Sequence, residues 1–262
     1  MKVVKIIISV SLLLNIISAR DSFANDDQDN EPNFVAFSFS SMAYSRYLGA
    51  GTSDILYKRP VLQTDLFANF QNGLWLNVWH STSLDNSDLS SDMGDELDIG
   101  FGFTNELPGG LSFDIGVHYF DCIDLLHMTK GDVIYPHAEI GRVIDINEQH
   151  SIKPFLHLSG LLSAYADEFG HTVYYRGGIG HEWKMTKSIN INQKAQLFYD
   201  KGGFCDYGSG LLAEYFLNSS YRLSGSVTID FLSIKAAMPL SSLSDDREFE
   251  VVFGAGITIT FY

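Results

Sequence analysis

The chain is poor in several residue types that mark common classes of protein. Its 262 residues include only 2 cysteines and 6 prolines, and 32 acidic residues outnumber 17 basic ones, which gives a formal net charge of −15. Binding to nucleic acid needs clustered lysine and arginine that neutralise phosphates, so this charge balance argues against it. The sequence also has no glycine-rich phosphate loop and no Cys/His cluster with metal-ligand spacing. It therefore predicts no cofactor.

Long apolar runs are also missing, apart from one at the N-terminus. Lys2 and Lys5 precede an apolar run over residues 6–17, which is shorter than the ~20 residues of a membrane-spanning helix. Ser22 and Ala24 then place small residues at positions −3 and −1 of a cleavage point. We therefore expect export through a cleaved signal peptide.

These features divide the chain into three parts. We expect a signal peptide over 1–24, a flexible polar lead-in over 25–33 and one outer-membrane β-barrel domain over 34–262. Removal of the signal peptide takes away three basic residues and one acidic one, which shifts the formal charge from −15 to −17. Such a charge suits a protein of the bacterial cell outer membrane whose loops and lumen are acidic.

The sequence is rich in aromatic residues and glycine, with 19 Phe, 13 Tyr, 3 Trp and 23 Gly. This mixture favours strands and tight turns. The clearest strand covers residues 95–105, where Leu97, Ile99, Phe101 and Phe103 alternate with acidic residues, glycine and threonine. Because successive side chains of a strand point to opposite faces, the pattern predicts one apolar face and one polar face.

The same alternation recurs along the chain and predicts twelve antiparallel strands. They are expected near 34–47, 60–70, 74–82, 95–105, 110–120, 133–146, 150–163, 172–185, 188–199, 209–218, 222–235 and 247–262. Short connections are expected at 71–73, 107–109, 147–149, 186–187 and 219–221, and longer polar ones at 48–59, 83–94, 121–132, 164–171, 200–208 and 236–246. Short turns at one end and longer loops at the other are typical of an outer-membrane barrel.

The predicted fold class is therefore all-β, a transmembrane antiparallel up-and-down β-barrel of about 12 strands. A soluble β-sandwich also alternates, but its strands typically have ~5–6 residues, whereas tilted membrane strands need ~9–11. Most segments here are of the longer kind. The last strand ends in Phe261 and Tyr262, which resembles the signal read by the barrel-assembly machinery.

If the apolar faces meet lipid, the opposite faces line the lumen. The predicted pore-lining residues are the charged and histidine side chains Arg46, Asp65, Glu96, Asp98, Asp114, His118, Glu139, Arg176, Glu182, Lys194 and Asp230. Carboxylates exceed basic groups among them, and rings of Asp and Glu favour cations in a pore. Because twelve strands lie between filled and wide-open barrels, both a narrow pore and a lumen closed by salt bridges stay open.

Two other chemistries have weaker support. His157, Ser159 and Glu168 are the residue types of a lipid A deacylase-like hydrolase, but the alternation turns His157 and Ser159 toward the lumen instead of the bilayer lipid. The loop over 83–93, with Asp85, Asp88 and Asp92, carries oxygen ligands suited to Ca²⁺ without the spacing of a calcium loop. We expect no enzyme and no metal site.

The two cysteines, Cys122 and Cys205, both fall in loops on the outer side of the predicted barrel. In an oxidising compartment they can bridge across the mouth or remain two separate thiols. The sequence leaves both arrangements open.

The first half of the predicted barrel resembles the TorF-like family of outer-membrane porins. The resemblance is carried by Arg46–Gly49, Pro60–Gln63, Gly73–Trp79, Gly94–Asp98 and Leu111–Gly116. It implies a porin-like architecture. The expected partners of such a barrel are outer-membrane lipids and lipopolysaccharide, the barrel-assembly machinery through the C-terminal strand, and small solutes. The sequence therefore favours a narrow diffusion channel for small polar or cationic solutes. A non-conducting surface or structural protein is the first alternative, and the barrel-embedded hydrolase is the second.

Overall fold

A computed structural model describes most of the predicted barrel. It covers residues 35–49, 55–84, 95–122, 131–164, 171–201, 210–241 and 248–261, so the predicted signal peptide (1–24) and lead-in (25–33) lie outside the described residues. The regular structure in these ranges is all β-strand. Within them, no helix has the length and apolar character needed to cross a membrane.

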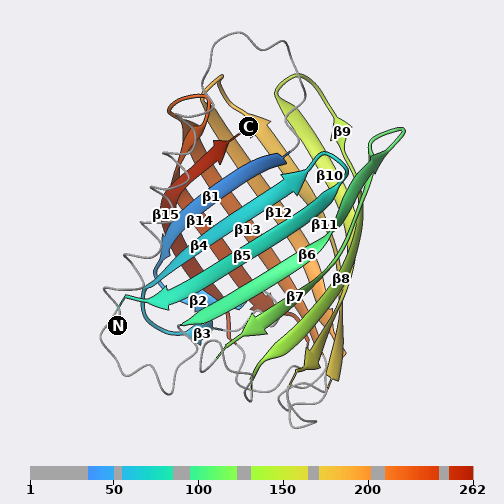
Figure 1. The fold of residues 1–262 in the computed structure, drawn as a ribbon, viewed down its shortest axis with the longest axis vertical. Coiled ribbons are helices and arrows are strands. Elements are labelled where there is room, and N and C mark those ends of the chain that lie inside the picture. The colour runs from blue at the N-terminus through green and yellow to red at the C-terminus, as the bar shows by residue number, and fades with distance from the viewer. Residues whose placement is uncertain are drawn as a thin grey trace. The chain divides into compact units, whose positions relative to one another are not determined.

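Twelve long strands form one antiparallel sheet that closes on itself (Figure 1). They are β1 (Val35–Tyr44), β4 (Val61–Phe70), β5 (Leu74–Ser83), β6 (Glu96–Leu107), β7 (Leu111–Asp121), β8 (Val133–Arg142), β10 (His150–Ser163), β11 (His171–Lys184), β12 (Ile189–Asp200), β13 (Gly210–Arg222), β14 (Val227–Pro239) and β15 (Glu250–Phe261). The pairing of β15 with β1 completes the ring. The short β9 (Ile144–Asp145) pairs with β10 beside β8. The predicted fold class and strand number are confirmed.

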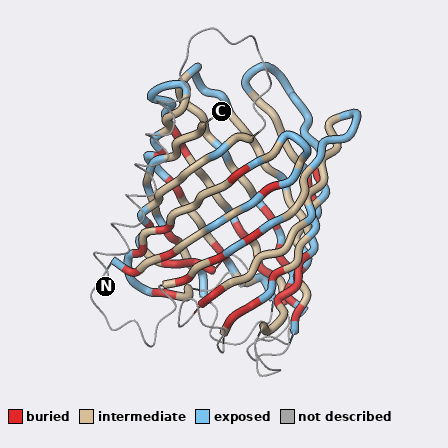
Figure 2. The backbone as a smooth tube through the Cα atoms, viewed as in Figure 1, coloured by how far each residue is buried: buried red, intermediate tan, exposed pale blue. Residues whose placement is uncertain are grey.

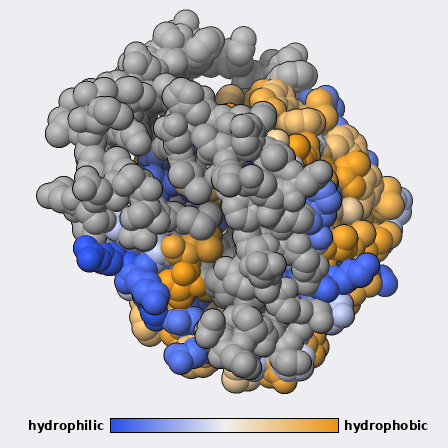
Figure 3. All heavy atoms as spheres, turned by 90° about the horizontal axis from the view of Figure 1, so that it is seen from below, coloured by the Kyte–Doolittle hydropathy of each residue, from blue (hydrophilic) through white to orange (hydrophobic). Residues whose placement is uncertain are grey.

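The alternation of side chains gives the barrel an apolar outside and a polar inside. Phe101 on β6 and Ile115 on β7 are 61% and 50% exposed on the outer surface. Glu96 and Asp98, which alternate with the apolar residues of β6, are buried. Figure 2 shows buried and exposed residues alternating along the strands, and hydrophobic residues cover much of the flank in Figure 3. A barrel with this exterior is suited to a lipid bilayer.

The described part of the connection between β1 and β4 contains strands where a loop was predicted over 48–59. It contains a two-stranded pair, β2 (Tyr47–Leu48) and β3 (Ile55–Tyr57), near the lower end of the barrel in Figure 1. Tyr47, Leu48 and Tyr57 are buried and pack against Val61 and other inward-facing side chains. This hairpin therefore lies against the inner face of the barrel.

The predicted turn at 219–221 is wrong. Ser219–Tyr221 belongs to β13, and the chain reverses between Arg222 and Val227, where the Leu223 amide donates to the Val227 carbonyl over 2.9 Å. The pairing of β13 with β14 shifts register between Ser219 and Ser220. This irregularity breaks the alternation at two buried serines. The pattern of residues at this point therefore resembles that of a turn.

The turn between β4 and β5 depends on one glycine. Gly73 has a φ of +90° and donates its amide to the Phe70 carbonyl over 2.9 Å. An added Cβ there would lie 2.3 Å from the Thr104 carbonyl oxygen. Glycine is required because only it adopts this conformation readily and leaves room for the neighbouring strand.

Candidate functional site on the inner face of the barrel

The eleven predicted pore-lining residues all lie within the described part of the chain. Ten are on barrel strands, and Arg46 lies between β1 and β2. Their contacts place them on the inner face, where most of them bind other side chains. Their role in lining a conducting pathway stays a prediction.

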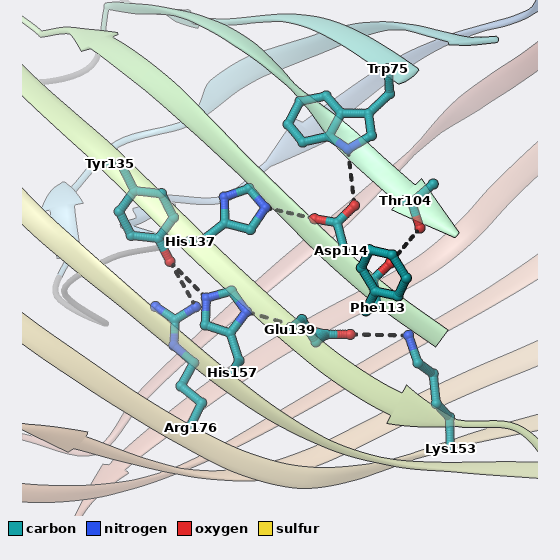
Figure 4. A network of polar contacts seen from close by, with 10 residues as sticks. All are labelled: Trp75, Thr104, Phe113, Asp114, Tyr135, His137, Glu139, Lys153, His157 and Arg176. Atoms are coloured by element: carbon teal, nitrogen blue, oxygen red, sulfur yellow. Dashed lines mark hydrogen bonds and ion pairs between the residues drawn. The ribbon is translucent and has the colours of Figure 1, made fainter. Parts of the chain in front are cut away.

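The centre of this inner network is Asp114 on β7. Its carboxylate accepts a hydrogen bond from the Trp75 indole over 2.9 Å and contacts the His137 Nε2 over 2.7 Å (Figure 4). Its neighbour across the β7–β8 pair is Glu139. Asp114 and Glu139 are therefore adjacent carboxylates, each with partners, whereas Asp98 pairs with Phe120 farther along β7.

Glu139 extends the network toward β10 and β11. It accepts from the Lys153 ammonium over 3.0 Å and lies 3.4 Å from the Nδ1 of His157. The Nε2 of His157 lies 3.3 Å from the Tyr135 hydroxyl, to which Arg176 donates over 3.2 Å. Side chains of β5, β7, β8, β10 and β11 are thus joined (Figure 4). The fixed partners give this part of the wall a defined shape.

Glycines make room for the aromatic rings of this wall. A Cβ on Gly102 or Gly116 would lie 2.3 Å from the Trp75 ring, and one on Gly100 would lie 2.3 Å from the His118 ring. His118 also packs against Trp75, with ring centroids 5.4 Å apart. The rings can lie close to the wall because these strand positions carry no side chain, which leaves more of the lumen free.

The acidic residues nearest the β2–β3 hairpin are buried. The Tyr47 hydroxyl donates to the Glu96 carboxylate, and the Tyr47 ring lies 5.7 Å from that of Trp79. Asp98 follows Glu96 on the inner face of β6 and is also buried. The hairpin is therefore tied to the acidic side of the inner wall.

The other predicted residues also have partners. Arg46 pairs with Glu250 over 2.7 Å, Asp65 accepts from Asn77, and Glu182 accepts from Asn190 over 2.9 Å. Asp230 accepts from Asn218 over 2.7 Å and from Thr258 over 2.8 Å. Lys194 lies over the Phe155 ring, 4.5 Å from its centroid.

Two inward lysines are absent from the predicted set. Lys153 lies on the same face of β10 as His157 and Ser159, so the alternation predicts its inward position. Lys235 does not, because strict alternation from Asp230 would point it outward; a register shift between Asp230 and Ser233 turns it inward. The sequence does favour an inward Lys235 in one respect, because a lysine on the lipid face near the midplane lowers stability by ~2–4 kcal/mol.

The hydrolase arrangement is not assembled among the described residues. Both ring nitrogens of His157 contact side chains of β8, and the buried Ser159 hydroxyl has no hydrogen-bond partner. A serine nucleophile needs a base within hydrogen-bond reach. Glu168 lies outside the described residues.

Asp85, Asp88 and Asp92 of the acidic loop also lie outside the described residues. The described part of the chain contains no group of three side chains placed to hold a metal ion.

Cys122, which follows β7, is buried and only 5% exposed. Burial raises the pKa of the Cys122 thiol well above its usual range, and nearby carboxylates such as Glu96 add to the shift. Cys205 lies outside the described residues, so the pairing of the two cysteines stays a prediction.

A single-cysteine variant tests the environment of Cys122. In Cys205→Ser, we expect a maleimide to label the folded barrel slowly and the urea-unfolded chain quickly, because the reagent needs an exposed thiolate. Mass spectrometry of timed samples gives the two rates. Equal rates for the folded and unfolded chain would show that Cys122 is accessible.

Solved structures with a similar fold include porins and an outer-membrane channel. The NanC porin aligns with a TM-score of 0.53 over 86% of this chain and 98% of its own, at 10% identity. The KdgM porin in complex with disordered oligogalacturonate aligns at 0.51 over 87% and 99%, also at 10% identity. An outer membrane channel from Pseudomonas putida F1 aligns at 0.52 over 90% and 99%, at 9% identity. No protein-family model and no curated protein matches the chain.

The closed ring of twelve strands, the apolar exterior and the charged interior define a porin-like outer-membrane β-barrel. The similarity to solved structures concerns the fold, because sequence identity is 10% or lower in the three alignments.

Proposed function

We propose that the protein is a TorF-like porin of the bacterial outer membrane, a narrow diffusion channel for small polar or cationic solutes. The observation that carries the proposal is the charged and hydrogen-bonded inner wall around Asp114 and Glu139, inside a barrel whose exterior is apolar. A wall of this kind supports the passage of hydrated solutes. The porin and channel neighbours of the fold agree with it.

The preference for cations follows from the balance of charge on the inner wall. Among the predicted pore-lining residues, seven are carboxylates and three are lysine or arginine. Asp114 is bound by a tryptophan and a histidine instead of a permanent cation, so its charge acts on the lumen. Fixed negative charge on a low-dielectric wall raises the local concentration of cations, and added salt weakens the effect.

Conductance in a planar lipid bilayer tests the channel directly. We expect single-channel steps and, under a KCl gradient, a reversal potential with the sign of cation selectivity. The triple variant Asp98→Asn/Asp114→Asn/Glu139→Gln should shift this potential toward zero, because it removes three inward carboxylates.

The matched control changes the same number of charges at the end of the barrel near the short turns. Glu106, Asp145 and Glu148 are exposed near the short turns, and their amide variants should leave the reversal potential unchanged. Anion selectivity of the unmodified protein, or equal selectivity of the two triple variants, would contradict the proposed preference. Absence of conductance from folded protein would favour the non-conducting surface protein.

A further inference from the structure

A cavity of about 350 Å³ opens on the inner face opposite the acidic network. Its walls come from β1, β12, β13, β14 and β15, and most of the lining side chains are the inward members of these strands. Small-molecule sites in proteins have volumes in this range. The cavity lies near the middle of β12 and β14, on the route that a solute would follow through the lumen.

Two lysines and one aromatic residue form a row across this cavity. Lys194 pairs in register with Phe216, and Phe216 pairs with Lys235, so the three side chains lie next to one another on the inner face. The Lys235 ammonium lies 4.2 Å from the centroid of the Tyr44 ring, and that of Lys194 lies 6.0 Å from the centroid of Phe216. The rings hold the two ammonium groups without neutralising them.

Neither lysine has an ion-pair partner among the residues that the structure describes, whereas Lys153 does. The two carboxylates that act on Lys194 are already bound, Glu139 by Lys153 and Glu214 by the Gln196 amide. The carboxylate of the cavity itself, Asp230, is held by Asn218 and Thr258. A charge on a low-dielectric wall is costly without a counter-ion, so an anion that binds here is stabilised by both lysines.

The cavity also offers hydrogen bonds for hydroxyl groups. The amide N–H of Asn218 donates to the Asp230 carboxylate, and this hydrogen bond fixes the orientation of the Asn218 amide. The buried amide oxygen of Asn218 has no partner. Asn192, Ser40 and Thr258 lie on the same lining. A ligand with hydroxyl groups next to its anionic group can satisfy the Asn218 oxygen, and the Tyr44 and Phe216 rings can pack against its carbon skeleton.

We infer that this cavity is a binding site for a small polyhydroxylated carboxylate, of the size and chemistry of a sugar acid. The carboxylate lies between Lys194 and Lys235, and the hydroxyl groups bind the amides and hydroxyls around Asn218. The inference rests on the proposed channel only for the route by which the ligand arrives. It adds an anion site on the basic wall to a lumen whose opposite wall is acidic.

Calorimetric titration of the folded barrel in detergent tests the site without any need for conductance. The probes are glucuronate, glucose and glucosamine, which share one sugar ring and differ in charge. We expect saturable binding of glucuronate, much weaker binding of glucose and none of glucosamine. Lys194→Gln and Lys235→Gln should each weaken glucuronate binding by about tenfold, because each removes a charge-assisted hydrogen bond.

Lys184→Gln is the matched control, because Lys184 is 59% exposed at the end of β11 and pairs with Glu182 outside the cavity. Lys235→Arg keeps the positive charge and should retain most of the affinity for glucuronate. It replaces the comparison at this position if Lys235→Gln fails to fold. Equal glucuronate affinity in the unmodified protein and the glutamine variants, or binding of glucosamine as well, would overturn the site. A barrel that binds glucuronate but does not conduct would contradict the channel and leave the site intact. A barrel that conducts but does not bind glucuronate would contradict the site and leave the channel intact.

Discussion

Arginine in place of Phe101 should lower the free energy of unfolding of the barrel in a lipid bilayer by ~2–4 kcal/mol. Phe101 is the most exposed of the apolar residues of β6 and lies near the middle of that strand. An arginine side chain there would enter the hydrocarbon layer, where its charge is poorly solvated. Ile115 on the neighbouring β7 occupies an equivalent outward position, so Ile115→Arg should have a similar cost.

Reversible urea titration in lipid vesicles, followed by tryptophan fluorescence, gives the free energies. The matched control is Asn105→Arg, which changes an exposed residue on the same face of the same strand, close to the short turn. Charged residues near the interface cost ~0–1 kcal/mol, so this variant should remain near the stability of the unmodified protein. If Phe101→Arg and Asn105→Arg cost the same, the outward register of β6 is wrong.

The barrel was predictable because its strands depend on local alternation. Each side chain of β6 and β7 has one of two faces to occupy, and the apolar residue is placed outward wherever the exterior is lipid. The short turns were predictable for the same kind of reason, since Gly73 and its neighbours carry local turn chemistry. Strand boundaries and pairing order therefore followed from the sequence over most of the chain.

The partners on the inner face were less predictable because they depend on the register between strands. That Asp114 meets His137 and that Glu139 meets Lys153 requires the alignment of β7, β8 and β10, which alternation within each strand leaves open. The inward position of Lys235 depends in addition on the irregularity after Asp230. A single misplaced residue changes the face of every side chain that follows it.

The β2–β3 hairpin was missed because its contacts are with distant strands. Nothing near Tyr47 in the sequence indicates that its ring is 4% exposed and packs against Trp79. A polar connection of this length is usually an exterior loop. Here apolar side chains of the hairpin and of the inner wall bury one another, which favours the inward position.

If the barrel is the proposed channel, removal of this hairpin should increase its conductance severalfold. Tyr47, Leu48 and Tyr57 occupy space on the inner face, and the Tyr47 hydroxyl ties them to Glu96. Tyr44 and Val61 are direct partners in the β1–β4 pair, so a short glycine–serine linker in place of residues 47–57 can join the two strands without disturbing them. Single-channel recording at fixed salt compares the shortened barrel with the unmodified protein.

A control variant carries the same linker in place of residues 223–226, the turn between β13 and β14, where no change in conductance is expected. Tyr47→Phe separates the effect of the Tyr47–Glu96 hydrogen bond from that of the bulk of the hairpin, because it removes only this hydrogen bond. We expect brief transitions between two conductance levels in this variant, as the hairpin leaves and returns to the wall. Identical conductance in the shortened and unmodified barrels would show that the narrowest part of the pathway lies elsewhere, with the wall around Trp75 and His118 as the next segment to test.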